Sequence, residues 1–327
     1  MKLVQVAAAA CLAMAAAVGG AFAQDYPNRP ITMVVPFSAG GPTDVVARIV
    51  GEHVSRTLGQ QIVVENVTGA GGTTGATRVK RAAPDGYTVL MGNLGSMAAS
   101  VGIYGEKLQY DPRADFEYVI NTGGVPMYLV PKKDLPVKDF AEFLTYVKAN
   151  AAKMNFGSGG VGATSHLTCL YLHSLLGIDV THVPFKGSGP AMQALLSGQV
   201  DYVCDQSTTV VPQIQGGALR GLMISAPKRS PLTPEVPTSA EVGQPKFIVS
   251  GWNAVFAPKG TPAPVVEKLN KAFAAALKDP SVLKRFGDLG VEVPGDEGLT
   301  PAALAAHIKA EVEKWTPVIK AAGVTGN

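Results

Sequence analysis

Two glycine-rich turns carry the residue types best suited to holding an anion. The first turn runs from Pro36 to Asp44, between a strand-like run at 31–35 and a helical stretch at 45–58. Its glycines allow a ligand to approach the backbone closely, and Pro42 suits the first position of a helix. No lysine or arginine lies between Pro36 and Asp44. Any attraction for an anion would therefore come from free N–H groups at the start of the helix.

The second turn, Gly157 to Gly162, matches the G-x-G-x-x-G spacing of dinucleotide sites. Such sites also need an acidic residue at the end of the next strand. Here Asp179 begins that strand, and residues 182–184 (His-Val-Pro) end it. We therefore expect no dinucleotide cofactor in this turn.

What the second turn shares with the first is a helix start that can hold a carboxylate or a phosphate. Thr164 and Ser165 could contact such an anion, or they could only cap the helix that follows. One loop of this kind would favour the capping interpretation. Two such loops, one in each half of the chain, favour a shared binding cleft.

Further polar residues follow predicted strands, and each has two interpretations. Lys186, in the turn Phe185–Pro190, could neutralise an anion or extend into solvent. Asp205 ends a predicted strand and could accept a hydrogen bond from a ligand or cap the next helix. Asp44 and Arg48 are spaced as an ordinary i,i+4 pair on a helix, which we expect to support the first turn.

The sequence offers little for catalysis. It contains no His-Glu-x-x-His, no Cys-x-x-Cys and no Gly-x-Ser-x-Gly motif, so neither a metal site nor a common hydrolase signature is indicated. His166 lies near Ser158 and Ser165, yet no carboxylate is placed to orient it. A secreted α/β enzyme, either a dinucleotide oxidoreductase or a serine hydrolase, remains the alternative hypothesis.

Short apolar runs alternate with amphipathic stretches, which indicates α/β units with mostly parallel sheets flanked by helices. One series covers residues 31–92 and a second covers 138–226. The helices predicted at 262–277, 280–288 and 300–322 have no sheet of their own, so we expect them to cover the first unit. The chain would then cross twice between two hinged lobes.

The first 23 residues resemble a secretory signal, with an apolar stretch and Ala21-Phe22-Ala23 before Gln24. We expect cleavage there and export. The formal charge of +3 becomes +2 when Lys2 is removed, which is too small to indicate binding to nucleic acid or a membrane surface. Cys169 and Cys204 remain after cleavage and are expected to be two buried thiols, with a disulfide as the alternative.

With these residues in view, the whole mature chain resembles the Bug family, the periplasmic solute receptors of tripartite tricarboxylate transporters. Many short segments match the family in order. They are Tyr26-Pro27, Pro36 to Gly41 with Asp44 and Arg48, Gly69 to Gly72, Pro84 to Thr88, Tyr110 to Pro112, Asn155 to Ser158, Ser165 to Leu167, Val183 to Gly187, Gly198 to Asp201, Lys228 to Ser230 and Ser250 to Trp252.

The resemblance implies a two-lobed periplasmic-binding-protein (Venus-flytrap) fold without catalysis, cofactor or metal. Lobe one would contain residues 24–124 and 252–327, and lobe two residues 125–251. The protein would act as a monomer that binds a small carboxylate and delivers it to membrane permease subunits. The family's ligands include amino acids, di- and tricarboxylates and aromatic acids.

The resemblance also implies the ligand contacts, which come from strand-to-helix loops in both lobes. The carried-over residues are Phe37, Ser38, Ala39, Gly40, Gly41, Gly95 and Ser96 in lobe one, and Ser158, Gly159, Ala163, Thr164, Ser165, Gly187, Ser188 and Asp205 in lobe two. The segment 96–104 lacks the Asn-Pro that many members carry there. The shape of that loop is therefore not predicted.

Overall fold

The computed structural model describes residues 26–326, so the predicted signal sequence lies outside the described residues. Its first sheet is built around β1 (Ile31–Val35), which pairs in parallel with β2 (Ile62–Asn66) and β3 (Thr88–Asn93). Strand β9 (Ser250–Pro258) runs antiparallel to both β3 and β4 (Phe116–Pro131).

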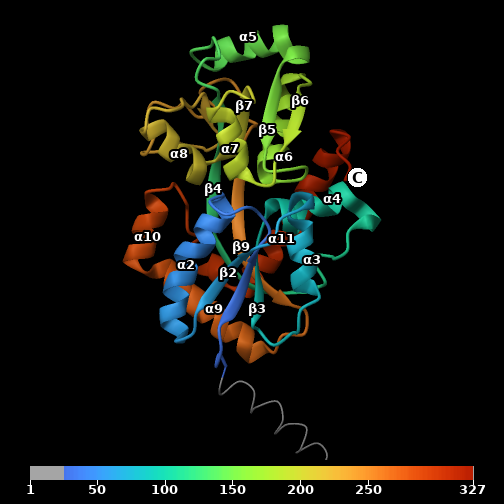
Figure 1. Ribbon diagram of the computed structural model, residues 1–327, viewed down its shortest axis with the longest axis vertical. Helices are drawn as coiled ribbons and strands as arrows, with labels where there is room; N and C mark the ends of the chain where they lie inside the picture. Colours follow the sequence, from blue (N-terminus) through green and yellow to red (C-terminus); the bar gives the residue numbers. More distant parts are fainter. Residues whose placement is uncertain (1–25, 327) are drawn as a thin grey trace, which may run out of the picture.

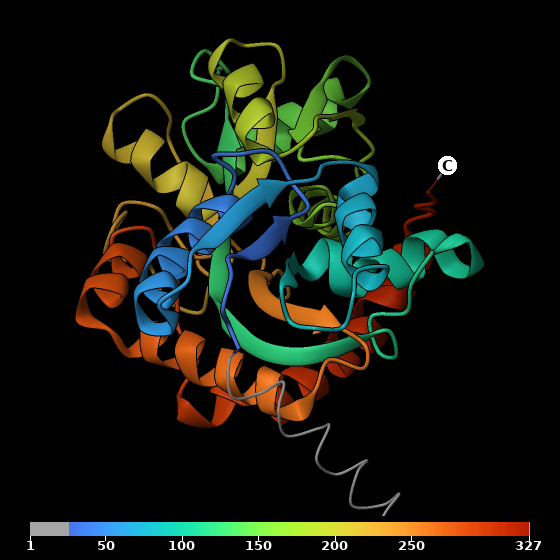
Figure 2. The ribbon, with the colours of Figure 1, turned by 60° about the horizontal axis from the view of Figure 1, so that its bottom comes forward.

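Helices cover this sheet because their apolar residues recur at helical spacing. In α2, for example, Val46, Val50 and Val54 lie four residues apart and are fully buried. Helix α9 packs against both β4 and α2. Figure 2 shows α9, in orange, beside the curved strand β4. The final helices therefore return to the first sheet, as predicted. The helices on this side are α2 (Pro42–Leu58), α3 (Thr73–Lys80), α4 (Ser100–Tyr104), α9 (Ala263–Lys278), α10 (Pro280–Gly287) and α11 (Pro301–Ala321).

The second sheet contains β5, β6 and β7 in parallel, and β7 is antiparallel to β4. A short strand, β8, also pairs with β4. The elements of this part are β5 (Asn155–Ser158), β6 (Thr181–Pro184), β7 (Tyr202–Gln206), β8 (Met223–Ile224), α5 (Phe140–Asn150), α6 (Thr164–Leu176), α7 (Ser188–Leu196) and α8 (Ser207–Gln215). Single helical turns lie at Ala70–Gly72, Gly105–Lys107, Ala151–Lys153 and Asp296–Leu299.

Strand β4 belongs to both sheets. Its residues Phe116 to Pro126 pair with β9, and Met127 to Pro131 pair with β7. Figure 1 shows the resulting two-lobed molecule, with the first sheet and its helices below and the second sheet above. The predicted fold class is confirmed, and β4 and β9 provide the two connections between the lobes.

Two segments depart from a simple alternation of strands and helices. Residues 219–226, at the end of the second series, pair with β4 only over Met223–Ile224. The segment after β3 forms a π-helical turn (Gly95–Ala99) that continues into α4. Small residues make this possible, because α11 packs closely against both segments, and a Cβ at Gly102 would lie 3.2 Å from Ile319 Cδ1 and from Thr316 Cα.

The expectation of two separate thiols was wrong. Cys169 of α6 and Cys204 of β7 form a disulfide, with Cα atoms 5.3 Å apart. Both residues are fully buried. Since α6 packs directly on β7, the two cysteines are neighbours in space although they lie 35 positions apart in the sequence.

Candidate functional site

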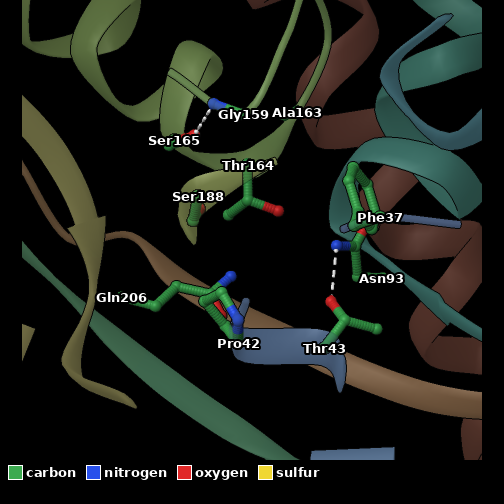
Figure 3. Close-up of a pocket in the computed structure, with 10 residues that line it drawn as sticks. All are labelled: Phe37, Pro42, Thr43, Asn93, Gly159, Ala163, Thr164, Ser165, Ser188 and Gln206. Carbon is green, nitrogen blue, oxygen red and sulfur yellow. Dashed lines mark hydrogen bonds between the residues drawn. The ribbon is translucent and has the colours of Figure 1, made fainter. Parts of the chain in front are cut away.

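A small closed cavity lies between the two lobes, at the ends of β1, β3, β5 and β7. Its volume is about 20 Å³, room for one water molecule at a minimum of about 10–15 Å³ each. Figure 3 shows the residues that line it. They are Phe37, Pro42, Thr43 and Asn93 from the first lobe, and Gly159, Ala163, Thr164, Ser165, Ser188 and Gln206 from the second.

Asp44 holds the first-lobe turn in place from behind. Its carboxylate accepts hydrogen bonds from the Gly40 N–H, from Arg48 Nε and from Asn66 Nδ2, each at 2.9 Å. Burial alone would raise the pKa of the Asp44 carboxyl, but these hydrogen bonds outweigh it and hold that pKa below its usual value. The predicted i,i+4 pair is confirmed, and it supports the turn without lining the cavity.

The second-lobe turn is shaped by its own side chains. Ser165 Oγ accepts a hydrogen bond from the Gly159 N–H at 2.9 Å, and His166 Nδ1 accepts one from the Gly162 N–H at 3.2 Å. On the opposite wall, Asn93 Nδ2 donates to Thr43 Oγ1 at 3.1 Å. Both walls are thus held by internal hydrogen bonds, two of which are drawn in Figure 3.

Four helices begin at this cavity without a side-chain cap. Helices α2, α6, α7 and α8 have Gly41, Ala163, Gly187 and Gln206 at the N-cap, and none of these side chains accepts a hydrogen bond from the helix. Elsewhere, α5, α10 and α11 are capped by Asp or Thr side chains, whereas α3 and α9 also begin without a side-chain cap. Uncapped N-termini leave backbone N–H groups and a positive dipole end for an anion.

Two polar side chains at the cavity lack partners. Thr164 Oγ1 and Gln206 Oε1 are buried and make no hydrogen bond within the described residues. The Thr164 hydroxyl points into the space between the walls (Figure 3). Buried polar atoms are rarely left unpaired, so both atoms indicate a binding site for a polar ligand.

The two lobes touch beside the cavity through backbone groups. The Ser38 N–H donates to the Lys186 carbonyl at 3.3 Å. Glycines make two further close approaches possible, because a Cβ at Gly95 would lie 2.6 Å from the Gly162 carbonyl oxygen and one at Gly71 would strike the Val161 carbonyl. The structure is therefore a closed form in which the loops of the two lobes meet.

Six of the predicted contact residues line the cavity, and nine do not. The six are Phe37, Gly159, Ala163, Thr164, Ser165 and Ser188. The other nine are Ser38, Ala39, Gly40, Gly41, Gly95, Ser96, Ser158, Gly187 and Asp205.

The structure gives several of those nine a different position. Gly95 and Gly187 contact the other lobe, and Ser96 Oγ accepts a hydrogen bond from the Asn93 backbone at 3.1 Å. Asp205 neither caps α8 nor reaches the cavity. Instead, its Oδ1 accepts a hydrogen bond from Ser188 Oγ at 2.8 Å.

Four lining residues were not predicted as contacts: Pro42, Thr43, Asn93 and Gln206. Asn93 and Gln206 are the last residues of β3 and β7. Ligands of open α/β sheets sit at the carboxyl ends of strands, and that rule could have found both residues.

Behind the second-lobe turn, three histidines pack together. The rings of His166 and His182 are 4.0 Å apart between centroids, and Phe156 lies 4.9 Å from His173. Burial lowers the pKa of His166 to about 3 and those of His173 and His182 to about 4. The Ser158 hydroxyl lies 2.6 Å from His182 Nε2, and Ser158 does not line the cavity.

Within residues 26–326, no group of three or more His, Cys, Asp or Glu side chains is arranged to hold a metal ion. No helix in that same range is long and apolar enough to cross a membrane.

Comparison with known proteins identifies the family. The model of the tripartite tricarboxylate transporter family receptor matches residues 46–324. The chain belongs to this family. The resemblance predicted from the sequence is thus confirmed, and the chain is a solute receptor of the periplasmic type that serves tripartite transporters.

Similar proteins extend over nearly the whole chain. The solved structure of MatC from Rhodopseudomonas palustris with bound malate is 45% identical, with a TM-score of 0.87 over 90% of this chain and 100% of that one. The periplasmic binding protein BugD is 43% identical, with a TM-score of 0.89 over 92% and 100%. The protein BugT of Bordetella pertussis is 35% identical over 92% of this chain and 91% of its own length.

Proposed function

We propose that this receptor binds a small organic carboxylate in the cavity between its lobes. The observation that carries the proposal is the convergence of four uncapped helix N-termini on one buried cavity without charged side chains. The unpartnered Thr164 and Gln206 atoms supply further sites for a polar ligand. The malate bound to the 45% identical MatC supports this ligand class.

Binding requires the lobes to open and close. A cavity of about 20 Å³ is too small for a carboxylic acid of several heavy atoms. We expect opening about β4 and β9, between lobe one (24–124 with 252–327) and lobe two (125–251). Because each lobe contributes helix N-termini, the closed form makes contacts with the ligand that the open form lacks, and this difference drives closure.

The nine predicted contacts that do not line the closed cavity then have three roles. Gly95, Gly187 and Ser38 permit the lobes to meet, while Ser96, Ser158 and Asp205 position neighbouring residues. Ala39, Gly40 and Gly41 belong to the turn that brings α2 to the cavity.

The remaining steps follow from family membership. We propose that residues 1–23 direct export and are cleaved, that the protein acts as a monomer in the periplasm, and that permease subunits in the membrane receive the ligand. No cofactor or metal is needed for any of these steps.

The enzyme alternative is not favoured. The closest arrangement to a hydrolase is the Ser158–His182 pair, but Ser158 is 1% exposed and does not line the cavity. Burial lowers the pKa of His182 to about 4, which makes it a weak base at neutral pH. We therefore propose that the protein is not an enzyme.

A thermal-shift screen tests the binding proposal. Protein that has been unfolded, stripped of ligand and refolded is mixed with mono-, di- and tricarboxylates. At least one acid is expected to raise the melting temperature in a concentration-dependent way, because a ligand that binds only the native state stabilises it. Absence of a shift with every acid would show that the cavity is not a carboxylate site.

A glycine substitution tests closure. Gly95→Ala is expected to weaken carboxylate binding about 10- to 150-fold, the loss of one charge-assisted hydrogen bond of about 1.5–3 kcal/mol. The added Cβ would lie 2.6 Å from the Gly162 carbonyl oxygen of the other lobe, so the lobes could not close fully. Calorimetric titration of wild type and variant measures the change.

The melting temperature of the ligand-free variant should stay within about 2 °C of wild type, because the clash exists only between closed lobes. Gly287→Ala is the control, since no heavy atom lies within 4 Å of a Cβ at that position. Equal affinity of Gly95→Ala and wild type would show that binding does not need this closed form.

A further inference from the structure

A buried carboxyl group lies directly behind the cavity, near the end of β7. Asp205 is 2% exposed and forms no ion pair within the described residues. Its Oδ1 accepts hydrogen bonds from Ser188 Oγ at 2.8 Å and from the Gln206 N–H at 2.9 Å. Ser188 and Gln206 both line the cavity. These two residues thus connect Asp205 directly to the site proposed for an anion.

A negative charge on Asp205 would have no cation to compensate it. No lysine or arginine lines the cavity, so a bound carboxylate would bring a second uncompensated negative charge to the same buried region. Two carboxylates that share such a region repel each other, and this repulsion favours the protonated form of one of them. A bound ligand should therefore raise the affinity of Asp205 for a proton.

The hydrogen bonds of Asp205 suit both of its protonation states. Thr209 Oγ1 lies 3.0 Å from Asp205 Oδ2 and also 3.0 Å from the Gln206 carbonyl oxygen. While Asp205 is ionised, the Thr209 hydroxyl can donate to Oδ2. When Oδ2 carries a proton, the same hydroxyl can accept it and donate to the carbonyl oxygen instead. Protonation therefore needs only the rotation of one hydroxyl group.

The titratable groups around Asp205 have other partners. None of them forms a hydrogen bond or an ion pair with Asp205 within the described residues. Helices α7 and α8 and strands β5 and β9 carry no titratable side chain, and Lys186, just before α7, is exposed. The groups on neighbouring segments and their partners are Tyr128 with Thr233, His166 with Gly162, His173 with Tyr202, Tyr171 with Lys246, Asp201 with Lys132, and Asp44 with Arg48.

Burial sets the pH at which Asp205 titrates. It raises the pKa of the Asp205 carboxyl to about 6, because the hydrogen bonds offset only part of the cost of removing the charged form from water. The group is therefore ionised at pH 7 in the ligand-free protein and takes up a proton just below neutral pH. Burial lowers the pKa of His166 to about 3 and that of His173 to about 4, so these two rings stay neutral over the same range.

We propose that the receptor takes up a proton at Asp205 when it binds its carboxylate ligand. This inference rests on the proposed function, and it makes Asp205 a positioning residue that acts on the ligand through Ser188 and Gln206. Coupling between two ligands is reciprocal, so a proton on Asp205 tightens carboxylate binding by the factor by which the carboxylate tightens proton binding. Affinity for the ligand should therefore rise as the pH falls through the range in which Asp205 titrates.

Calorimetric titration measures the proton directly. Refolded, ligand-stripped full-length protein is titrated at pH 6.5 with malate, lactate, glutamate and benzoate, in buffers that differ in their enthalpy of ionisation. The dependence of the observed enthalpy on the buffer gives the number of protons taken up. These acids are themselves almost fully ionised above pH 6. For a tenfold coupling, we expect roughly half a proton per ligand and about a fourfold gain in affinity from pH 7.5 to pH 6.

Two variants assign the proton to Asp205. Asp205→Asn keeps the shape of the side chain but cannot ionise, so it should take up no proton and bind equally tightly at pH 7.5 and pH 6. Ser188→Ala removes a hydrogen bond to the ionised form, which raises the pKa of Asp205, so its proton uptake should be greatest at a higher pH than in wild type. Asp201→Asn is the control, because Asp201 pairs with Lys132 at 3.0 Å just before β7. It should keep the wild-type proton uptake.

The outcomes separate this inference from the receptor proposal. If an acid binds without proton uptake, or if Asp205→Asn takes up as many protons as wild type, the coupling is wrong and the receptor proposal stands. If Asp205→Asn does not fold, Ser188→Ala decides, and an unshifted maximum of proton uptake would overturn the coupling. If none of the four acids binds, the acid with the largest shift in the thermal screen replaces them. If that screen finds no acid, both proposals are wrong.

Discussion

Removal of the disulfide between Cys169 and Cys204 is expected to lower the free energy of unfolding by roughly 3–4 kcal/mol. The bond closes a loop in which 35 positions separate the two cysteines. A crosslink over that length restricts the unfolded chain, and the chain-entropy model gives a stabilisation of this size. Urea denaturation of wild type and of Cys169→Ala/Cys204→Ala measures the difference.

Reduction of the wild-type protein serves as the control for packing. Reduced wild type retains both sulfur atoms in the fully buried core and lacks only the bond. It should lose most of the same free energy as the double variant. Free thiols in denatured, unreduced protein, or an unfolding midpoint insensitive to reductant, would mean that the two cysteines are separate.

The disulfide also joins two walls of the cavity. Helix α6 begins at Thr164, five residues before Cys169, and β7 ends at Gln206, two residues after Cys204. Both of these residues line the cavity. We therefore expect the double variant to bind its carboxylate more weakly as well as to unfold more easily.

The sequence predicted the parts of this molecule that depend on local signals. Helix α2 begins at Pro42 and is followed by Gly59 in a left-handed conformation. A proline at the start and a glycine after the end are sequence signals of helix boundaries. The strand-to-helix turns were also predicted from local signals, namely glycines and prolines between a strand-like run and a helical stretch. The family segments then added residues such as Ser188, whose contribution to the cavity could not be read from spacing alone.

What the sequence could not predict depends on contacts between distant segments. Successive residues of a strand point to opposite sides, so either Asp205 or Gln206 could have faced the ligand. Only the placement of β7 beside β4 and β5 shows that Gln206 lines the cavity. The approach of Gly95 to Gly162 and the pairing of the cysteines likewise join segments that are far apart in the chain.

The second large effect is expected on acidification. The free energy of unfolding should fall as the pH is lowered from about 7 to about 5, because His166 and His173 are buried and neutral in the native state. Burial lowers their pKa values to about 3 and about 4, below the usual 6.5. Unfolded histidines therefore bind protons between pH 6.5 and 4 that the native ones do not. Protonation favours the unfolded state throughout this range.

The slope follows from the number of protons taken up on unfolding. One histidine contributes up to about 1.4 kcal/mol per pH unit, so these two together remove roughly 3–4 kcal/mol between pH 7 and pH 5. His182 acts in the same direction, since burial lowers its pKa to about 4. The nearest titratable neighbour is Tyr202, whose hydroxyl lies 2.7 Å from His173 Nε2, and none of the hydrogen bonds of the three rings within the described residues involves a carboxylate.

His173→Phe tests this explanation, because it keeps an aromatic ring and removes one titrating group. Its free energy of unfolding, measured by urea denaturation from pH 7 to pH 5, should fall less steeply by up to about 1.4 kcal/mol per pH unit. Phe143→Leu is the control. It disturbs the same cluster, 5.2 Å from the Tyr202 ring, but leaves every imidazole, so its slope should match wild type. An unchanged slope in His173→Phe would show that the acid sensitivity arises elsewhere.

Protonation of native His166 should weaken ligand binding, but only near pH 3. The Gly162 N–H donates to His166 Nδ1, and a protonated Nδ1 cannot accept that hydrogen bond. Gly162 lies in the turn between Gly159 and Ala163, which both line the cavity. Because native His166 has a pKa of about 3, this loss of affinity lies below the pH range in which the unfolded histidines lower the free energy of unfolding.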